Sequence, residues 1–264
     1  MLQLTNSLNI QPTYFLCFLT SFLADNPLKP PFLCSVILML AMLAPAPATA
    51  LEPTVDQLLQ NLQDEWSDIF YRQPADIQAE KFEKLLPKVH ELVERYPDLA
   101  EPLVLEAQVL CTYAGAEVGF GSLRKLKRAK ELLLKSIAIN PTALEAGAYV
   151  TLGNLYYRLP GWPISYGNDD LARQYLETAL KLFPDELDTN YFYGDFLMGQ
   201  GEFRQAIAYL EKADKAEVRQ QNRLGDLKLK AEVKQRLKAA QQQNDNGGDF
   251  FSSLLPSFDE EPAK

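Results

Sequence analysis

The segment from Asn190 to Ala213 reads NYFYGDFLMGQGEFRQAIAYLEKA and contains the signals of two short helices joined by a tight turn. Its first half places a large-small pair, Tyr193-Gly194, between bulky residues at helical spacing. The glycines of the turn, Gly199-Gln-Gly-Glu202, suit the left-handed conformations in which helices commonly end. The second half carries a stripe of small, bulky and small residues at offsets of four and three: Ala206, Leu210 and Ala213. The segment therefore predicts a pair of closely packed helices.

The same spacing recurs in four segments of the chain, which indicates a repeat protein. Offsets of four and three put the side chains on one helical face, and a proline five residues later ends the helix in three of the four segments. The four sets are Leu85, Val89, Leu92 and Pro97; Ala129, Leu133, Ser136 and Pro141; Ala172, Leu176, Ala179 and Pro184; and Ala206, Leu210, Ala213 and Val218.

This succession of residues resembles the tetratricopeptide repeat (TPR) family. The resemblance implies an all-α fold, a right-handed α-solenoid of TPR-like helix pairs with a C-terminal capping helix. We expect an atypical N-terminal helix pair over residues 51–97 and TPR-like pairs over 98–218. The polar stretch 215–240 predicts the capping helix, and the Gln-, Asn- and Gly-rich stretch that follows predicts a disordered tail over 241–264.

Residues 1–50 are typical of an N-terminal prefix and a signal peptide rather than of a folded domain. The apolar run Phe32–Ala44 is shorter than a membrane span and is followed by small residues that suit cleavage near Ala50. We therefore expect a protein exported to the periplasm. Two alternatives stay open: a leader retained as an anchor, and a translation start downstream of Met1.

Charge and residue content narrow the classes of function. A formal net charge of −9 argues against nucleic acid or an anionic membrane surface as the main partner, because a surface that carries phosphates needs a basic surface to meet it. His90 is the only histidine, so triads and metal sites built on histidine are excluded. Cys111 has no base near it in sequence. We predict no enzymatic activity, no catalytic residue, no metal site and no cofactor.

Two Gly-aromatic insertions, 111–122 and 159–170, separate the first helix from the second in adjacent pairs. Insertions at equivalent places in adjacent repeats fall on one face of the stack. Four aromatic side chains are therefore expected along one edge, where they would capture a ligand or, alternatively, plug the gap between longer loops: Tyr113, Phe120, Trp162 and Tyr166.

A second candidate surface is the concave wall formed by the first helix of each pair. One residue beyond the small Ala or Gly faces this wall and is polar in each case, and aromatic and cationic residues follow on the same face. The alternative is an ordinary solvated surface. The predicted wall residues are Gln108, Asn154, Tyr157, Arg158, Tyr191 and Asp195, with Arg158 as a cation for a carboxylate.

The run LPGWPISYGNDDLAR at 159–173, together with NYFYG at 190–194, is similar to the periplasmic T components that accompany some TRAP transporters. That resemblance implies a protein partner, namely a periplasmic solute-binding protein, a small carboxylate or hydrophobic ligand, and a homo-oligomer. We expect a non-enzymatic accessory of such a transporter. The alternative is a general cell-envelope scaffold that docks an extended peptide in its concave groove.

Overall fold

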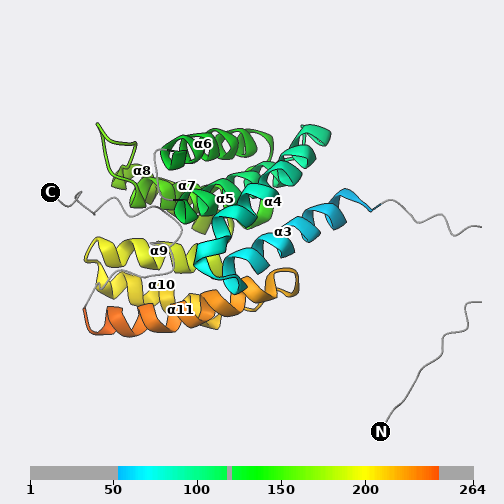
Figure 1. The fold of residues 1–264 in the computed structure, drawn as a ribbon. Coiled ribbons are helices and arrows are strands. Elements are labelled where there is room, and N and C mark those ends of the chain that lie inside the picture. Colours follow the sequence, from blue (N-terminus) through cyan, green and yellow to red (C-terminus); the bar gives the residue numbers. More distant parts are fainter. Residues whose placement is uncertain (1–52, 118–120, 244–264) are drawn as a thin grey trace, which may run out of the picture. The chain divides into compact units, whose positions relative to one another are not determined.

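The computed structural model describes residues 53–117 and 121–243 (Figure 1). Phe120, the predicted signal peptide and most of the predicted tail lie outside these residues. The described part is all-helical, with nine α-helices, one short 3₁₀ helix and no strand. The helices are α3 Val55–Arg72, α4 Ala75–Arg95, α5 Glu101–Ala116, α6 Gly121–Ile139, α7 Ala143–Arg158, α8 Asp169–Leu182, α9 Leu187–Gly199, α10 Phe203–Lys215 and α11 Arg223–Gln241, with the 3₁₀ helix η1 at Gln220–Asn222.

Consecutive helices pack in pairs, which confirms the predicted TPR-like helical solenoid. The pairs are α3 with α4, α5 with α6, α7 with α8, and α9 with α10, and α11 packs against α10 and α9. Helix α11 begins later than the sequence predicted, because Ala216 to Arg219 and η1 separate it from α10. None of the helices in the described ranges is long and apolar enough to cross a membrane.

The small residues of the repeat lie where the two helices of a pair approach most closely. A Cβ added to Gly153 of α7 would lie 2.5 Å from Cγ of Leu176 on α8. At Gly194 of α9 the corresponding distance to Leu210 Cγ on α10 is 2.9 Å. Both leucines are fully buried members of the repeated stripe. The residue spacing that defines the repeat therefore reflects the close contact between the two helices of a pair.

The two insertions adopt different structures. The first half of the first insertion continues α5, which runs to Ala116 because Cys111 and Ala114 are buried against the core. The second is a loop over residues 159–168, since Pro160 and Pro163 disfavour helix both at their own positions and at the residues before them.

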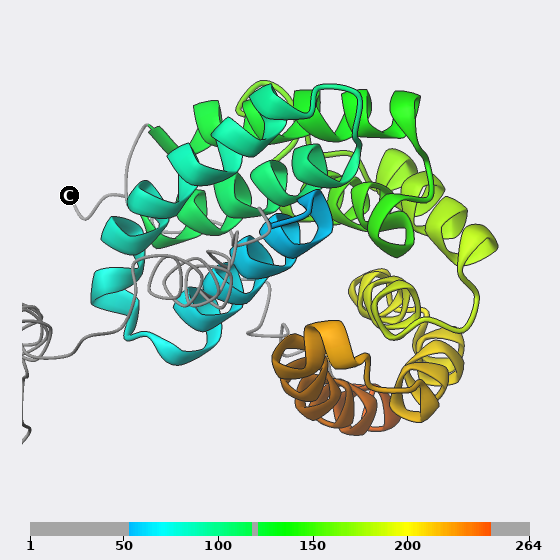
Figure 2. The same ribbon diagram turned by 90° about the vertical axis from the view of Figure 1, so that its right-hand side faces the viewer.

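The row of pairs curves so that its first helix contacts its last (Figure 2). Gln60 on α3 donates a side-chain N–H to the backbone carbonyl of Gln221 in η1 at 2.8 Å. Helix α3 also packs against α5 as well as against its own partner α4. The N-terminal pair thus differs from the others in placing its first helix across the stack.

Candidate functional site

A cavity of about 650 Å³ lies between α3, the first helices of the next three pairs, and the segment that leads into α11. Gln108 of α5, Thr151 of α7 and Phe192 of α9 contribute to one wall. Leu59 and Trp66 of α3 contribute to the opposite wall, and residues 219–225 close one side. We call this cavity the concave groove. The first helices line it, as expected of a concave wall, but Gln108 alone of the six predicted wall residues lines it, and α3 covers part of it.

Helix α3 is held over α5 by a buried aromatic group. The indole N–H of Trp66 donates to Thr112 Oγ1 at 3.1 Å, and the Trp66 ring stacks on Phe70 with 5.4 Å between centroids. Trp66 and Ile69 join an apolar cluster that includes Phe82 of α4. Buried contacts therefore anchor α3, which forms one wall of the groove.

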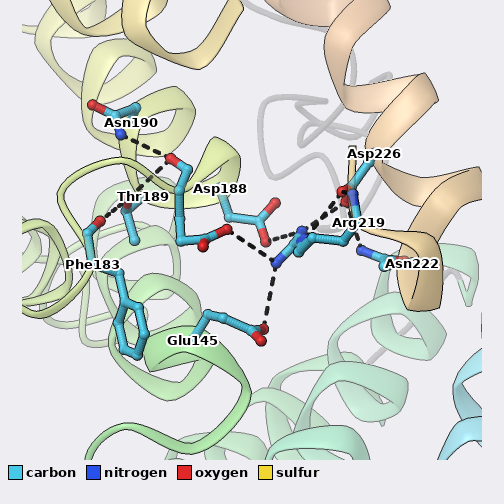
Figure 3. A network of polar contacts seen from close by, with 9 residues as sticks. Glu145, Phe183, Asp188, Thr189, Asn190, Arg219, Asn222 and Asp226 are labelled. Carbon is cyan, nitrogen blue, oxygen red and sulfur yellow. Dashed lines mark hydrogen bonds and ion pairs between the residues drawn. The ribbon is translucent and has the colours of Figure 1, made fainter. Parts of the chain in front are cut away.

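Arg219 lies at the centre of the polar side of the groove (Figure 3). Its guanidinium forms ion pairs with Asp188 and Asp226, each at 2.7 Å, and longer ones with Glu145 at 3.4 Å and Glu186 at 3.9 Å. Burial alone would lower the pKa of Arg219, but the charges of Asp188 and Asp226 outweigh it and raise that pKa. Arg219 is a fixed cation that joins α7, α9 and α11.

The carboxylates around Arg219 outnumber the guanidinium four to one. Burial raises the pKa of Glu145 and of Asp188, and Arg219 only partly offsets this effect. Both side chains line the groove and remain about one third exposed. The cluster around Arg219 therefore carries a surplus of poorly solvated negative charge, which a cationic group would stabilise.

Glu145 occupies an unusual backbone conformation at the start of α7. Leu144, Glu145 and Ala146 have φ values of 46°, 50° and 60°, in the left-handed region that favours glycine. Such a residue costs roughly 1–2 kcal/mol. The tertiary contacts of this turn, including the ion pair from Glu145 to Arg219, offset that cost.

The predicted wall residues lie at different depths. Gln108 is half-buried and lines the groove. Asn154 and Tyr191 are 2% and 1% exposed, and the Asn154 amide donates to the Val150 carbonyl at 3.0 Å within α7. These two residues therefore support the helix packing and offer no open surface to a ligand.

Arg158, predicted to meet a ligand carboxylate, instead meets a carboxylate of the protein. It forms an ion pair with buried Asp195 of α9, and Arg236 of α11 pairs with the same carboxylate. Tyr157 packs edge-on against Phe196 with 5.2 Å between ring centroids. A carboxylate ligand at Arg158 would have to displace Asp195.

The aromatic residues that were predicted to line one edge differ in exposure and in what they contact. Trp162 is 90% exposed, so it does not plug a gap. The Tyr166 hydroxyl donates to the Leu126 carbonyl of α6 at 3.0 Å. Tyr113 packs with the α3 and α4 cluster and lies beneath Lys125, whose Nζ is 4.2 Å from its ring centroid. Tyr113 and Tyr166 belong to separate apolar clusters.

The sequence analysis did not identify the Arg219 cluster or the position of α3. Asp185, Glu186 and Asp188 follow Pro184 at the start of a helix, where acidic residues are common because they interact with the positive end of the helix dipole. The only signal at Arg219 is its place directly after Val218, where the fourth repeat lacks its proline. Arg219 is separated in sequence from Asp188 by 31 positions and from Glu145 by 74, so no local sequence pattern links these residues.

Few residues in the described ranges have side chains suited to nucleophilic catalysis or metal binding. Burial raises the pKa of the Cys111 thiol to about 12, which disfavours the nucleophilic thiolate. His90 is half exposed and contacts Glu106 with 3.2 Å between Nδ1 and Oε1. The part of the chain that the structure describes contains no group of three or more metal-ligating side chains.

A tetratricopeptide repeat family model matches residues 165–232, from the end of the loop before α8 into α11. The match includes the uninterrupted pair of α9 and α10, and Arg219. No curated protein matches the chain. Tetratricopeptide repeats generally mediate protein–protein interaction.

Proposed function

We propose that this protein is an interaction module that docks a segment of a protein partner in the concave groove. The observation that carries this proposal is the cavity itself, which is lined by the first helices of successive pairs. Concave surfaces of stacked helix pairs are the usual binding surfaces of such proteins. The cavity volume of about 650 Å³ falls in the usual range of ligand-binding pockets.

The lining indicates the chemistry of the segment. Apolar side chains such as Leu59, Val150 and Phe192 offer area to aliphatic or aromatic residues, while Gln108 and Thr151 offer hydrogen bonds. The acidic surplus at Glu145 and Asp188 favours a lysine or arginine of the partner. The proposed ligand is therefore an extended peptide that places a cationic side chain near Arg219 and apolar ones beside α3.

Two narrower assignments stay predictions. Export to the periplasm rests on residues 1–50 alone. A role as an accessory of a TRAP-type transporter, with a solute-binding protein as partner, rests on sequence resemblance, whereas the matching family model is that of a repeat found with many partners. The paired state of Arg158 gives no support to a small carboxylate ligand at that residue.

The proposal is tested by site-specific photocrosslinking in cells that produce the protein. A photoreactive amino acid replaces Gln108, which lines the groove, or Lys181, which is exposed on α8 and lies outside it. We expect position 108 to give a discrete crosslinked protein. Position 181 should not crosslink to the same protein. Its identity as a solute-binding protein would support the narrower role.

A matched pair of threonine substitutions supplies the control. Thr151→Tyr fills the groove, whereas Thr178→Tyr adds the same group on α8, outside the groove. Crosslinking from Gln108 should be lost with the first substitution and kept with the second. Equal crosslinking in both variants would show that the partner does not enter the groove.

A further inference from the structure

The loop between α7 and α8, residues 159–168, projects beyond the ends of its neighbouring helices (Figure 1). Its tip carries Trp162 and Ile164, which are 90% and 65% exposed. They are the two most exposed of the large apolar side chains in the described ranges, where the next is 48% exposed. Two such side chains together on a tip mark a candidate interaction surface.

The loop is braced by hydrogen bonds. Gly167 donates its backbone N–H to the Pro160 carbonyl at 3.0 Å, and Asn168 donates to the Tyr156 carbonyl at 2.8 Å. A Cβ at Gly167 would lie 1.8 Å from the Leu159 carbonyl oxygen, so this close approach requires glycine. Tyr166 fixes the loop to α6. A fixed tip loses little conformational entropy when it binds.

The helix on which the loop rests is strongly basic. Helix α6 carries six cationic side chains and one carboxylate, in a chain whose net charge is −9. Lys130 Nζ lies 4.0 Å from the Tyr166 ring centroid, which places this charge beside the loop. Arg124 and Lys127 are exposed on the same half of the helix. Positive charge is therefore concentrated on the helix to which Tyr166 fixes the loop.

Nearby carboxylates offset part of this charge. Glu117 pairs with Lys125, and Glu131 lies 3.6 Å from Arg128. Asp169 and Asp170 begin α8 directly after the loop. Arg124 and Lys127 take part in none of the ion pairs found among the described residues, so they are the cations best placed to meet an external anion.

We propose that the loop tip and the N-terminal half of α6 together dock on an anionic lipid surface. Trp162 and Ile164 would enter the boundary between headgroups and acyl chains, where tryptophan is favoured. Arg124 and Lys127 would contact lipid phosphates, each adding to the attraction. The pairing of an apolar tip with adjacent cations is what an interfacial membrane site requires.

A lipid surface fits this region better than a folded partner does. The apolar residues form a projection, and neither they nor any residue of α6 line the concave groove. A projecting tip needs a deformable surface or a matching hollow, and the flanking cations fit a surface that carries many anions. This site uses elements other than those of the concave groove, so it is independent of the proposed function.

The test measures binding of the full chain to vesicles of phosphatidylcholine with and without phosphatidylglycerol. Co-sedimentation gives the bound fraction, and tryptophan emission reports insertion. Trp66 is buried and hydrogen-bonded, so a blue shift on vesicle addition reports Trp162. The apolar run Phe32–Ala44 is present in every variant and contributes equally to each.

Three variants are compared with the wild type. Trp162→Ala should weaken partitioning to anionic vesicles by at least about tenfold, because it removes the main apolar contact. Arg124→Glu with Lys127→Glu should weaken it by at least about twentyfold, since each lost cation contributes about fivefold. Lys228→Glu with Lys234→Glu makes the same charge change at exposed sites on α11 and should change partitioning by less than about twofold.

Several outcomes would overturn the proposal. Wild-type tryptophan emission that is unchanged by anionic vesicles would do so, as would equal partitioning of the wild type and the Trp162→Ala variant. An equal loss in the α11 control would show that overall charge alone is responsible. If the loop and α6 variants lose binding to an acidic protein while vesicle binding is unchanged, the surface docks protein and not lipid.

Discussion

Trp66 and Thr112 are joined by a buried hydrogen bond across α3 and α5, with 3.1 Å between the indole nitrogen and Oγ1. Thr112 Oγ1 also lies 3.0 Å from the carbonyls of Gln108 and Val109 on its own helix. The contact fixes one wall of the concave groove to the other. The stability of α3 and the shape of the groove therefore depend on the same pair.

Trp66→Phe is expected to lower the free energy of unfolding by about 1–2 kcal/mol, since it removes a buried donor and part of a packed ring. Trp162→Phe is the matched control, because Trp162 is 90% exposed and should change stability little. Urea unfolding followed by circular dichroism measures both. Equal stabilities of the two variants would show that α3 is not held by Trp66.

The close contact within the third pair makes a second prediction. Gly153→Ala would place Cβ 2.5 Å from Leu176 Cγ, inside the contact distance of two carbons. We expect a loss of about 2 kcal/mol from the shifts that this overpacking forces. Thermal unfolding of the purified variant measures it.

Gly147→Ala in the same helix supplies the control of opposite sign. Its added Cβ would lie 3.4 Å from Val104 Cγ1, an ordinary contact. Gly147 does not have a positive φ, so alanine fits its backbone and stabilises by about 0.4–1 kcal/mol, chiefly by lowering the entropy of the unfolded chain. Destabilisation of similar size at both sites would mean that the repeat spacing does not report close helix approach.

The sequence predicted those features that repeat at fixed spacing. Gly153 and Gly194 mark equivalent helix contacts, and their partners Leu176 and Leu210 each lie four residues after the first alanine of the stripe, Ala172 or Ala206. The pair order and most helix bounds follow from this periodicity, because each pair buries its stripe against its neighbours.

Features that depend on contacts between distant segments could not be predicted in this way. Arg219 reaches Glu145 on α7, and Gln60 reaches Gln221, across spans without any shared pattern. The concave wall was predicted by analogy with a regular repeat, which does not foresee that Asp195 pairs with Arg158 or that Tyr191 is buried. The tip residue Trp162 was identified, but its exposure required the structure.

The left-handed turn at the start of α7 makes a third prediction. Ala146→Gly should raise the free energy of unfolding by about 1 kcal/mol, because glycine adopts a φ of 60° without the Cβ clash. Ala148→Gly, at a buried helical position two residues on, should lower it by about the same amount. Urea unfolding of both variants gives the comparison. A loss in both would indicate a regular helix at Ala146.

Removal of Arg219 makes a fourth prediction, in which the effect depends on pH. Arg219→Met leaves Asp226, Asp188, Glu145 and Glu186 without their shared cation, and breaking a buried ion pair in this way costs about 3–5 kcal/mol. Arg223→Met removes an exposed cation only four residues away and should change stability little. Thermal unfolding of both variants at pH 7 measures the difference.

The sign of the pH dependence follows from the pKa shifts. Burial raises the pKa of Glu145 and Asp188 above their ordinary values, and Arg219 lowers both, so its removal raises them further. A carboxyl whose pKa is higher in the folded protein than in the unfolded chain destabilises the fold progressively as pH rises through that interval. The deficit of Arg219→Met relative to Arg223→Met should therefore be largest near neutral pH and shrink as pH falls and these carboxyls take up protons. A deficit that is constant over this range would mean that Arg219 contributes by packing and not by balancing the charge of the groove.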